Sequence, residues 1–300
     1  MQSYQVAVLG GGPAGLAAAL TLSRAMISTV VFDGPEPPRN AAARQVRGLA
    51  GRDLTPPAAF RAAVAEEIAR YGHAERRDVA VEAISGDLES GFLLYGSDGT
   101  QVGAERLLLA TGMVDLLPAL PGFGDFWGES IVNCPFCDGF ELQGQAWAVL
   151  ADRPEMLEAA EVYRNWTDDL VFIVPPEVAL APARAAEIEA AGTKILRRAV
   201  VGLSGEGARL RELELDDGTR LARDVLLVFP RQRQCRIVEA LAPETDAEGY
   251  LVVDAGFRSS LPGVYAAGDL LHALEQNANT SLHMGHLAAV SLVFDICKAR

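Results

Sequence analysis

Two cysteines and an aspartate lie close together in the stretch NCPFCDGFE, residues 133–141. Cys134 and Cys137 have a spacing found in redox-active dithiols, in half of a zinc site, or by chance in two buried thiols. A structural zinc site commonly uses two such pairs, and the chain has no second CxxC and no histidine at finger-like spacing to this one. We therefore expect no metal and interpret the pair as a redox disulfide. A helix start would suit it, because free N–H groups there stabilise a thiolate.

A glycine-rich turn near the N-terminus predicts a dinucleotide site. In VAVLGGGPAGLAAALTLSRAMISTVVFD, an apolar strand is followed by G-x-G-x-x-G, an alanine-rich helix, and a second strand that ends in an aspartate. The first glycine permits a tight turn, the second lets backbone approach a pyrophosphate, and the third lets the helix pack closely on the strand. The carboxylate would accept a hydrogen bond from a ribose hydroxyl. The candidate residues are Gly10, Gly12, Pro13, Ala14, Gly15 and Asp33.

Two later segments follow the glycine-rich turn in an order that resembles two-dinucleotide-domain flavoprotein disulfide reductases, and this resemblance implies FAD as the dinucleotide. RLLLATG, residues 106–112, reads as an apolar strand that ends in Ala-Thr-Gly, and GVYAAGDLL, residues 263–271, reads as a strand that ends in Gly-Asp. An aspartate after a strand is also a common helix N-cap, so Asp269 could serve either purpose or both. The candidate cofactor contacts in these segments are Thr111, Gly112, Gly268 and Asp269.

The order of these segments, the chain length and the position of the CxxC resemble low-molecular-weight thioredoxin reductases over essentially all 300 residues. The resemblance implies FAD as the cofactor, contact of Asp269 with its ribitol and pyrophosphate region, and a homodimer. It also implies that Cys137 faces the flavin, that Cys134 exchanges with the substrate, and that Asp138 donates and accepts the proton. Judged from the sequence alone, Asp138 could equally be an N-cap or a surface acid.

The C-terminal flavin segment departs from that family's pattern. Where the family has Arg-Gln-Ala before a helix, this chain has Gln276-Asn277-Ala278 and then NTSLHMGHLAA. We include Gln276, Asn277 and Ala278 among the candidate FAD contacts and expect an altered flavin environment. His283 could lie near the isoalloxazine ring or be an ordinary solvent or core histidine, and its role stays open.

The predicted fold class is α/β, with two Rossmann-like units, the second inserted into the first. We expect an FAD-binding domain formed by residues 1–117 and 245–300, and an inserted pyridine-nucleotide-type domain over residues 118–244 that carries the CxxC. Prolines and glycines at 118–124 mark the first crossing between the domains, and a turn at 246–249 marks the second. Two crossings form a hinge, where relative motion of domains is common.

The insert has its own β-α-β pattern. We expect strands at 146–151 and 169–174 around an amphipathic helix at 155–166, and then a hairpin around Asp217 and Gly218 that leads into a further strand.

The turn after the insert's first strand lacks what a nicotinamide dinucleotide needs. Residues 151–156 read Ala-Asp-Arg-Pro-Glu-Met, with no glycine, two carboxylates and a proline that has no N–H to donate. The second strand runs into Pro175-Pro176-Glu177, with no cation for a 2′-phosphate. Because two independent requirements fail together, we expect no conventional NADPH binding and interpret the insert as a scaffold that presents the CxxC.

Composition limits the partners. The chain carries 40 acidic and 26 basic residues, a formal net charge of −14, which argues against nucleic acids and anionic membranes. Arginine clusters such as Arg39, Arg44 and Arg47 could form local patches for an acidic partner, but a solvated face or contacts to phosphates is the favoured interpretation for any one of them. Four cysteines are too few for a secreted disulfide framework, and the apolar N-terminal run is broken by glycines, so we expect a soluble cytoplasmic protein.

Together the motifs favour an FAD-dependent thiol–disulfide oxidoreductase that NADPH does not reduce. Electrons could come from a ferredoxin or another donor and leave to a thioredoxin-like protein. Alternatively, a small dithiol could be oxidised by the disulfide and the reduced flavin by oxygen. The run PGF-x-x-x-WG and the Pro-Phe between the cysteines resemble dithiol oxidases of the gliotoxin and holomycin type, whereas Asp138 matches the reductases. A conventional NADPH thioredoxin reductase and a non-catalytic flavin redox sensor are the remaining alternatives.

Overall fold

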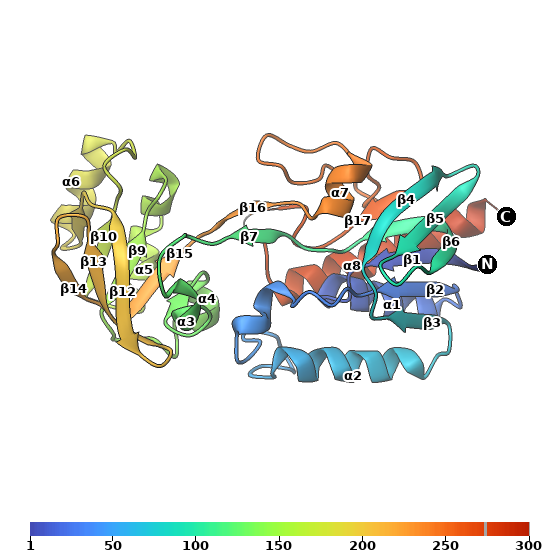
Figure 1. Ribbon diagram of the computed structural model, residues 1–300, viewed down its shortest axis with the longest axis horizontal. Coiled ribbons are helices and arrows are strands. Elements are labelled where there is room, and N and C mark those ends of the chain that lie inside the picture. The colour runs from blue at the N-terminus through green and yellow to red at the C-terminus, as the bar shows by residue number, and fades with distance from the viewer. Residues whose placement is uncertain (273–274, 300) are drawn as a thin grey trace. The chain divides into compact units, whose positions relative to one another are not determined.

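The computed structural model describes residues 1–272 and 275–299 (Figure 1). Contacts within the chain divide it into two compact units. Unit 1 comprises Met1–Ala41, Thr55–Asp115 and Gln232–Arg300, and unit 2 comprises Ala42–Leu54 and Leu116–Arg231. Each unit contains a mostly or wholly parallel sheet with helices, so the predicted α/β class is confirmed.

Unit 1 is built on a seven-stranded sheet. Its strands are β1 (Gln2–Leu9), β2 (Thr29–Phe32), β3 (Ala74–Arg77), β4 (Val81–Asp87), β5 (Gly91–Gly96), β6 (Gln101–Leu109) and β17 (Val264–Ala266). β1 lies between β2 and β6 and is parallel to both. The first residues of β6 pair with β5 in antiparallel fashion, and its last residues pair in parallel with β17. A C-terminal strand therefore completes the parallel order β3-β2-β1-β6-β17, which is that of a Rossmann unit.

The helices of unit 1 are η1 (Arg39–Ala42), α1 (Pro13–Arg24), α2 (Pro57–Ala69), α7 (Arg236–Leu241) and α8 (Ala278–Lys298), of which η1 ends one residue inside unit 2.

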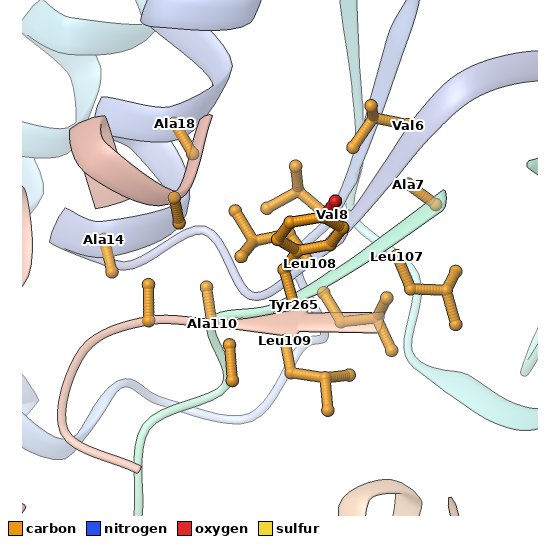
Figure 2. Packing of buried hydrophobic residues seen from close by; sticks show 14 of the residues in the cluster. Val6, Ala7, Val8, Ala14, Ala18, Leu107, Leu108, Leu109, Ala110 and Tyr265 are labelled. Atoms are coloured by element: carbon orange, nitrogen blue, oxygen red, sulfur yellow. The ribbon is translucent and has the colours of Figure 1, made fainter. Parts of the chain in front are cut away.

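The core of unit 1 combines large side chains of the sheet with small ones of helix α1. Figure 2 shows the ring of Tyr265 among buried side chains of β1 and β6, including Val8 and Leu108. Ala14 and Ala18 of α1 add only methyl groups, which lets the helix lie close to the sheet.

Helix α8 is long and apolar enough, by length and composition alone, to span a membrane. It packs along α1, and its Gly285 lies so close to Ala14 that a Cβ on the glycine would be 2.0 Å from the Ala14 carbonyl oxygen. Such close backbone packing within unit 1 is that of a core helix, so we interpret α8 as one.

Unit 2 contains a five-stranded parallel sheet in the order β11-β10-β9-β15-β8 and a three-stranded antiparallel sheet. The parallel strands are β8 (Ile131–Val132), β9 (Trp147–Leu150), β10 (Leu170–Ile173), β11 (Lys194–Leu196) and β15 (Val225–Val228). The antiparallel strands are β12 (Val200–Glu206), β13 (Arg209–Leu215) and β14 (Arg220–Ala222). The predicted hairpin around Asp217 and Gly218 is confirmed as the turn between β13 and β14. Gly218 has φ +81°, which suits that turn.

The single helix expected at 155–166 is wrong. A 3₁₀ turn, η2 (Pro154–Leu157), and one turn of helix, α5 (Ala160–Tyr163), occupy this place, with Ala159 at φ −96° and ψ +17° between them. Arg184 of α6 (Pro182–Ala190) donates hydrogen bonds to the carbonyl oxygens of Leu157 (2.9 Å) and Glu158 (3.4 Å). In a continuous helix these two carbonyl groups would accept backbone hydrogen bonds from the next turn. The Arg184 side chain, distant in sequence, therefore competes with the helix for them.

The bounds of the units differ in three places from the domains expected from the sequence. The first crossing lies between Asp115 and Leu116 rather than between residues 117 and 118. The second crossing lies at Arg231 and Gln232 rather than near residue 245, and the turn at 246–249 is inside unit 1. In addition, the short segment Ala42–Leu54 groups with unit 2 although the chain before and after it belongs to unit 1. Two short helices of unit 2, α3 (Phe123–Phe126) and α4 (Pro135–Asp138), complete the elements near the CxxC. The connecting strands β7 (Val114–Leu116) and β16 (Arg231–Arg233) pair with each other.

Candidate functional site

The turn between β1 and α1 forms an open cradle. A Cβ on Gly10, which has φ +111°, would lie 2.2 Å from the carbonyl oxygen of Ala110, and one on Gly15 would lie 1.9 Å from that of Gly10. Both positions therefore require glycine for close backbone contact. Gly12 differs, because nothing lies within 4 Å of the place where its Cβ would be. It is the N-cap of a twelve-residue helix that begins with Pro13 and Ala14, so free N–H groups and the helix dipole are directed at open space.

Asp33, the expected ribose acceptor, lies at the end of β2 beside this cradle. Its Oδ1 accepts a hydrogen bond from the Gly11 amide (3.2 Å), and its Oδ2 pairs with Arg61 and with Arg76 (2.9 Å). The two arginines were not anticipated. They come from α2 and β3, and no short sequence pattern connects them with the aspartate.

The other FAD candidates of unit 1 gather after β6 and β17, whose carboxyl ends lie side by side because the strands are parallel. Thr111 and Gly112 follow β6, and Gly268 and Asp269 follow β17. Gly268 has φ +92°, and a Cβ there would lie 3.0 Å from the Ala14 methyl. Burial raises the pKa of Asp269, while Arg39 and a hydrogen bond from the Ser281 hydroxyl (3.0 Å) lower it.

Arg39 connects the FAD candidates in a polar network that the sequence did not reveal. Its Nε donates to Asp115 Oδ2 (2.8 Å), and its Nη1 donates to Gln276 Oε1 (2.6 Å) and to Asp269 Oδ2 (3.2 Å). Gln276 and Gln232 exchange further hydrogen bonds. The arginine is only 23% exposed, so it is a structural cation of unit 1 rather than part of a free basic patch.

The remaining C-terminal candidates, Asn277, Ala278 and His283, lie at the N-terminal end of α8. Asn277 caps α8 by accepting a hydrogen bond from the Thr280 amide (2.9 Å), and Ala278 is the first residue of that helix. His283 is an exposed residue in the second turn of α8. Among residues 1–272 and 275–299, no group of three or more potential metal-ligating side chains is placed to hold an ion.

These features of unit 1 fit an FAD molecule. The open cradle at Gly12 and the helix N-terminus suit a pyrophosphate, and Asp33 suits an adenosine ribose. Asp269 offers a half-buried carboxylate close to the start of α1.

In unit 2, Cys134 and Cys137 form a disulfide with their Cα atoms 5.2 Å apart. Cys134 is the N-cap of α4, and its Sγ accepts a hydrogen bond from the Cys137 amide (3.1 Å). Both cysteines are partly buried. The pair therefore lies at a helix start, where a backbone N–H already contacts one sulfur.

Asp138, the last residue of α4, is held by a charge cluster. Its carboxylate forms an ion pair with Arg47, whose Nε also lies 3.1 Å from Glu141 Oε1. Burial raises the pKa of Asp138 to about 6; Arg47 lowers it, and the negative charges of Glu141 and Glu129 raise it. A carboxyl with such a pKa exchanges protons readily near neutral pH.

Aromatic residues surround the disulfide. Phe136, between the cysteines, is 77% exposed and meets Trp166 edge to face at 5.4 Å between ring centroids. Trp166 in turn stacks on the buried Trp147 of β9. Phe140, just after α4, is 76% exposed. The disulfide is thus bordered by apolar surface that a substrate could cover.

The turn after β9 in unit 2 is closed where the turn after β1 is open. Ala151 is fully buried, Arg153 pairs with Asp152 (3.0 Å) and donates to the Phe229 carbonyl oxygen (3.2 Å), and a 3₁₀ turn replaces a long helix. A cavity of about 350 Å³ lies at the carboxyl ends of β9, β10 and β15. Its charged lining residues are Asp152, Glu177 and Arg231. Two of these three carry the sign of charge that repels phosphate.

Known proteins share both the sequence pattern and the fold. The family model for pyridine nucleotide-disulphide oxidoreductases matches residues 4–285. Thioredoxin reductase tcpT of Claviceps purpurea is 32% identical over 302 residues, which cover 94% of this chain and 90% of that protein.

Solved structures share the fold of this chain. A putative thioredoxin reductase TrxB from Bacillus anthracis is 28% identical, with a TM-score of 0.92 over 99% of both chains. The crystal structure of HlmI is 30% identical, with a TM-score of 0.90 over 99% of this chain and 95% of that one. The chain therefore belongs to the pyridine nucleotide-disulphide oxidoreductase family and is a thioredoxin reductase-like flavoprotein disulfide oxidoreductase, an enzyme with FAD as its cofactor.

Proposed function

We propose that the protein is an FAD-dependent thiol–disulfide oxidoreductase that works through Cys134 and Cys137 and does not take its electrons from NADPH. The observation that carries the proposal is a combination of two features in unit 2. A disulfide is followed by a carboxyl group that can exchange protons near neutral pH, and the turn where a nucleotide would bind is closed. Candidate FAD contacts lie in unit 1. They are Gly10, Gly12, Pro13, Ala14, Gly15, Asp33, Thr111, Gly112, Gly268, Asp269, Gln276, Asn277 and Ala278.

In the direction of dithiol oxidation, Asp138 as a carboxylate takes the proton of a substrate thiol. The substrate sulfur attacks Cys134 Sγ, the Cys134–Cys137 bond breaks, and its electron pair stays on Cys137 as a thiolate. The second substrate thiol then attacks the mixed disulfide, which releases the substrate disulfide and the Cys134 thiolate, while its proton goes to solvent. Two electrons have passed to the enzyme dithiol. Bound FAD supplies a two-electron acceptor or donor. Disulfide reduction runs through the same steps in reverse, with Asp138 as the acid.

The turn after β9 argues against NADPH as the donor. A pyrophosphate needs backbone N–H groups at close approach, but a buried alanine, an Asp152–Arg153 pair and a proline occupy that place. The cavity at this edge of the sheet adds the Asp152 and Glu177 carboxylates, which disfavour the dianionic 2′-phosphate of the adenosine end. Another electron donor, such as a ferredoxin or flavoprotein, would then serve in the reductive direction, with a thioredoxin-like protein as the acceptor.

A second candidate is an oxygen-dependent oxidase of small dithiols. Phe136 and Phe140 favour it, because Phe136 lies between the cysteines, Phe140 follows the second one by three residues, and both aromatic side chains are more than three-quarters exposed and open to apolar contact with a small molecule. In that reaction bound FAD would pass the two electrons of the dithiol to molecular oxygen, which with two protons would become hydrogen peroxide.

The proposal is tested by anaerobic reduction of the FAD-loaded protein with dithiothreitol, monitored by flavin absorbance. We expect the wild type to be bleached and Cys137→Ser to stay oxidised, although both bind FAD. Equal bleaching of the two proteins would contradict use of the disulfide and favour a flavin sensor. Admission of oxygen then separates the candidates: rapid recovery of the oxidised spectrum with hydrogen peroxide release supports the oxidase, and slow recovery supports the protein-linked reductase.

A further inference from the structure

Arg47 reaches Asp138, which follows the disulfide in sequence, from a distant part of the chain. It lies on the segment Ala42–Leu54, which is flanked on both sides by chain of unit 1 but groups with unit 2. Val46 and Leu49 beside it are buried, so the segment is packed rather than solvated. The Arg47 side chain is 16% exposed and that of Asp138 is 15% exposed. At this burial an ion pair is stronger than one at the surface.

We propose that Arg47 is a positioning residue for Asp138, which it holds ionised and in a fixed orientation next to the Cys134–Cys137 disulfide. This inference rests on the proposed proton-transfer role of Asp138. Arg47 contacts neither sulfur in the hydrogen bonds and ion pairs of the described residues, so it would act through the carboxylate alone.

The geometry gives Arg47 two carboxylates to contact. Its Nη1 donates to Asp138 Oδ1, and its Nε lies 3.1 Å from Glu141 Oε1 without the alignment of a hydrogen bond. The better-aligned contact is therefore the one to Asp138. Arg44, on the same segment, pairs instead with Glu129.

The charges around Asp138 act in opposite directions. Burial raises its pKa to about 6, Arg47 opposes that rise, and Glu141 and Glu129 add to it. The disulfide sulfurs do not titrate. Loss of Arg47 must then raise the pKa of Asp138 further, and loss of the Glu141 charge must lower it. A residue that only supports the fold would not produce shifts of opposite sign in two variants of one cluster.

The direct test is a carboxyl ¹³C NMR titration of the FAD-loaded, aspartate-labelled protein, with Asp138→Asn to assign the signal. We expect the Asp138 pKa to rise by about one to two units in Arg47→Gln, to move less in Arg47→Lys, and to fall in Glu141→Gln. Arg44→Gln is the comparison variant, because it removes an arginine that is 72% exposed from the same segment and that pairs with Glu129 rather than with Asp138; it should raise the pKa of Asp138 far less than Arg47→Gln does.

Kinetics provide the second readout. The rate of flavin reduction by dithiothreitol should increase as pH rises through the pKa of Asp138, because the carboxylate is the base. With a pKa of about 7.5 in Arg47→Gln in place of about 6, the ionised fraction at pH 7 falls from roughly nine-tenths to one-quarter. The rate at pH 7 should then fall about fourfold and recover at higher pH, with partial rescue by Arg47→Lys.

The results separate this inference from the proposed function. An unchanged Asp138 pKa in Arg47→Gln, or shifts of the same sign in Arg47→Gln and Glu141→Gln, would overturn the role of Arg47. If instead the NMR shifts occur as expected but Asp138→Asn reacts with dithiothreitol at the wild-type rate, Arg47 still controls the carboxylate and the proposed role of Asp138 in catalysis fails.

Discussion

Unit 1 and unit 2 each place a turn after the first strand of a parallel sheet, yet the two turns have opposite character. After β1, glycines leave a cradle with nothing within 4 Å of the missing Gly12 side chain, and α1 continues for twelve residues. After β9, the equivalent space holds a buried alanine and an ion pair, and only a four-residue 3₁₀ turn follows. A short 3₁₀ turn directs fewer aligned N–H groups at a ligand than a full helix does.

The comparison shows that the same kind of parallel sheet can be followed by turns of opposite chemistry. The sheet of unit 2 is held by fully buried residues of β9, β10 and β15, and Ala151 and Leu157 of the turn pack in the same hydrophobic cluster. Asp152 and Arg153 lie outside that cluster and are only partly buried, so the polar chemistry of the turn can differ while the core stays the same. Beside that sheet, unit 2 carries the Cys134–Cys137 disulfide and the buried carboxyl group of Asp138.

The largest expected effect comes from filling the cradle of unit 1. Gly12→Val places a side chain where the pyrophosphate would lie, at a backbone conformation (φ −79°, ψ −175°) that any residue can adopt. We expect FAD affinity to fall by at least about 100-fold, as measured by flavin fluorescence on dilution, with the far-UV circular dichroism unchanged. Gly124→Val is the control, because Gly124 also has open space but lies in α3 of unit 2. If both variants lose FAD affinity equally, the open cradle of unit 1 is not the specific site of the pyrophosphate.

A smaller effect is expected from the cation of the unit 1 network. Arg39→Gln leaves Asp115 and Asp269 without the arginine that both contact. Because Asp269 would then carry an uncompensated charge near a dianionic pyrophosphate, FAD affinity should fall about tenfold. Arg39→Lys should restore part of it. Unchanged affinity in Arg39→Gln, measured by the same dilution assay, would mean that the network only supports the strands β7 and β16, which carry Asp115 and Gln232.

The smallest effect is expected from reopening unit 2. The triple variant Asp152→Gly, Pro154→Gly, Glu177→Arg removes two carboxylates and restores a cation and backbone space. NADPH should bind it a few-fold more tightly than the wild type, because α5 and η2 still do not form a continuous helix. Saturation-transfer NMR with NADPH measures the change. Tight NADPH binding by the wild type would show that the closed turn is no obstacle.

The fold was predictable from the sequence where pattern and local chemistry agree. The G-x-G-x-x-G turn, β2, the strands of the insert and the hairpin at Asp217 and Gly218 lie where hydrophobic periodicity and turn residues place them. The prediction of a helix at 155–166 is wrong, because two backbone carbonyl groups in this stretch accept hydrogen bonds from Arg184, whose position depends on tertiary structure.

The candidate site was predictable only in its local parts. The spacing of Cys134 and Cys137 shows that they can bond, but no sequence pattern shows that Arg47 reaches Asp138 or that Arg39 reaches Asp269. Clustered arginines suggested a patch for an acidic partner, whereas Arg39 and Arg47 neutralise carboxylates of the protein itself. Contacts between residues about 90 and 230 positions apart are decided by folding, and a single sequence does not record them.

The most direct test of the central claim is a pair of anaerobic titrations of the FAD-loaded wild type, one with dithiothreitol and one with NADPH, each monitored by flavin absorbance. The account predicts that dithiothreitol bleaches the flavin through Cys134 and Cys137, and that NADPH in excess leaves the spectrum oxidised. Rapid bleaching by near-stoichiometric NADPH would contradict it and identify a conventional NADPH-dependent reductase.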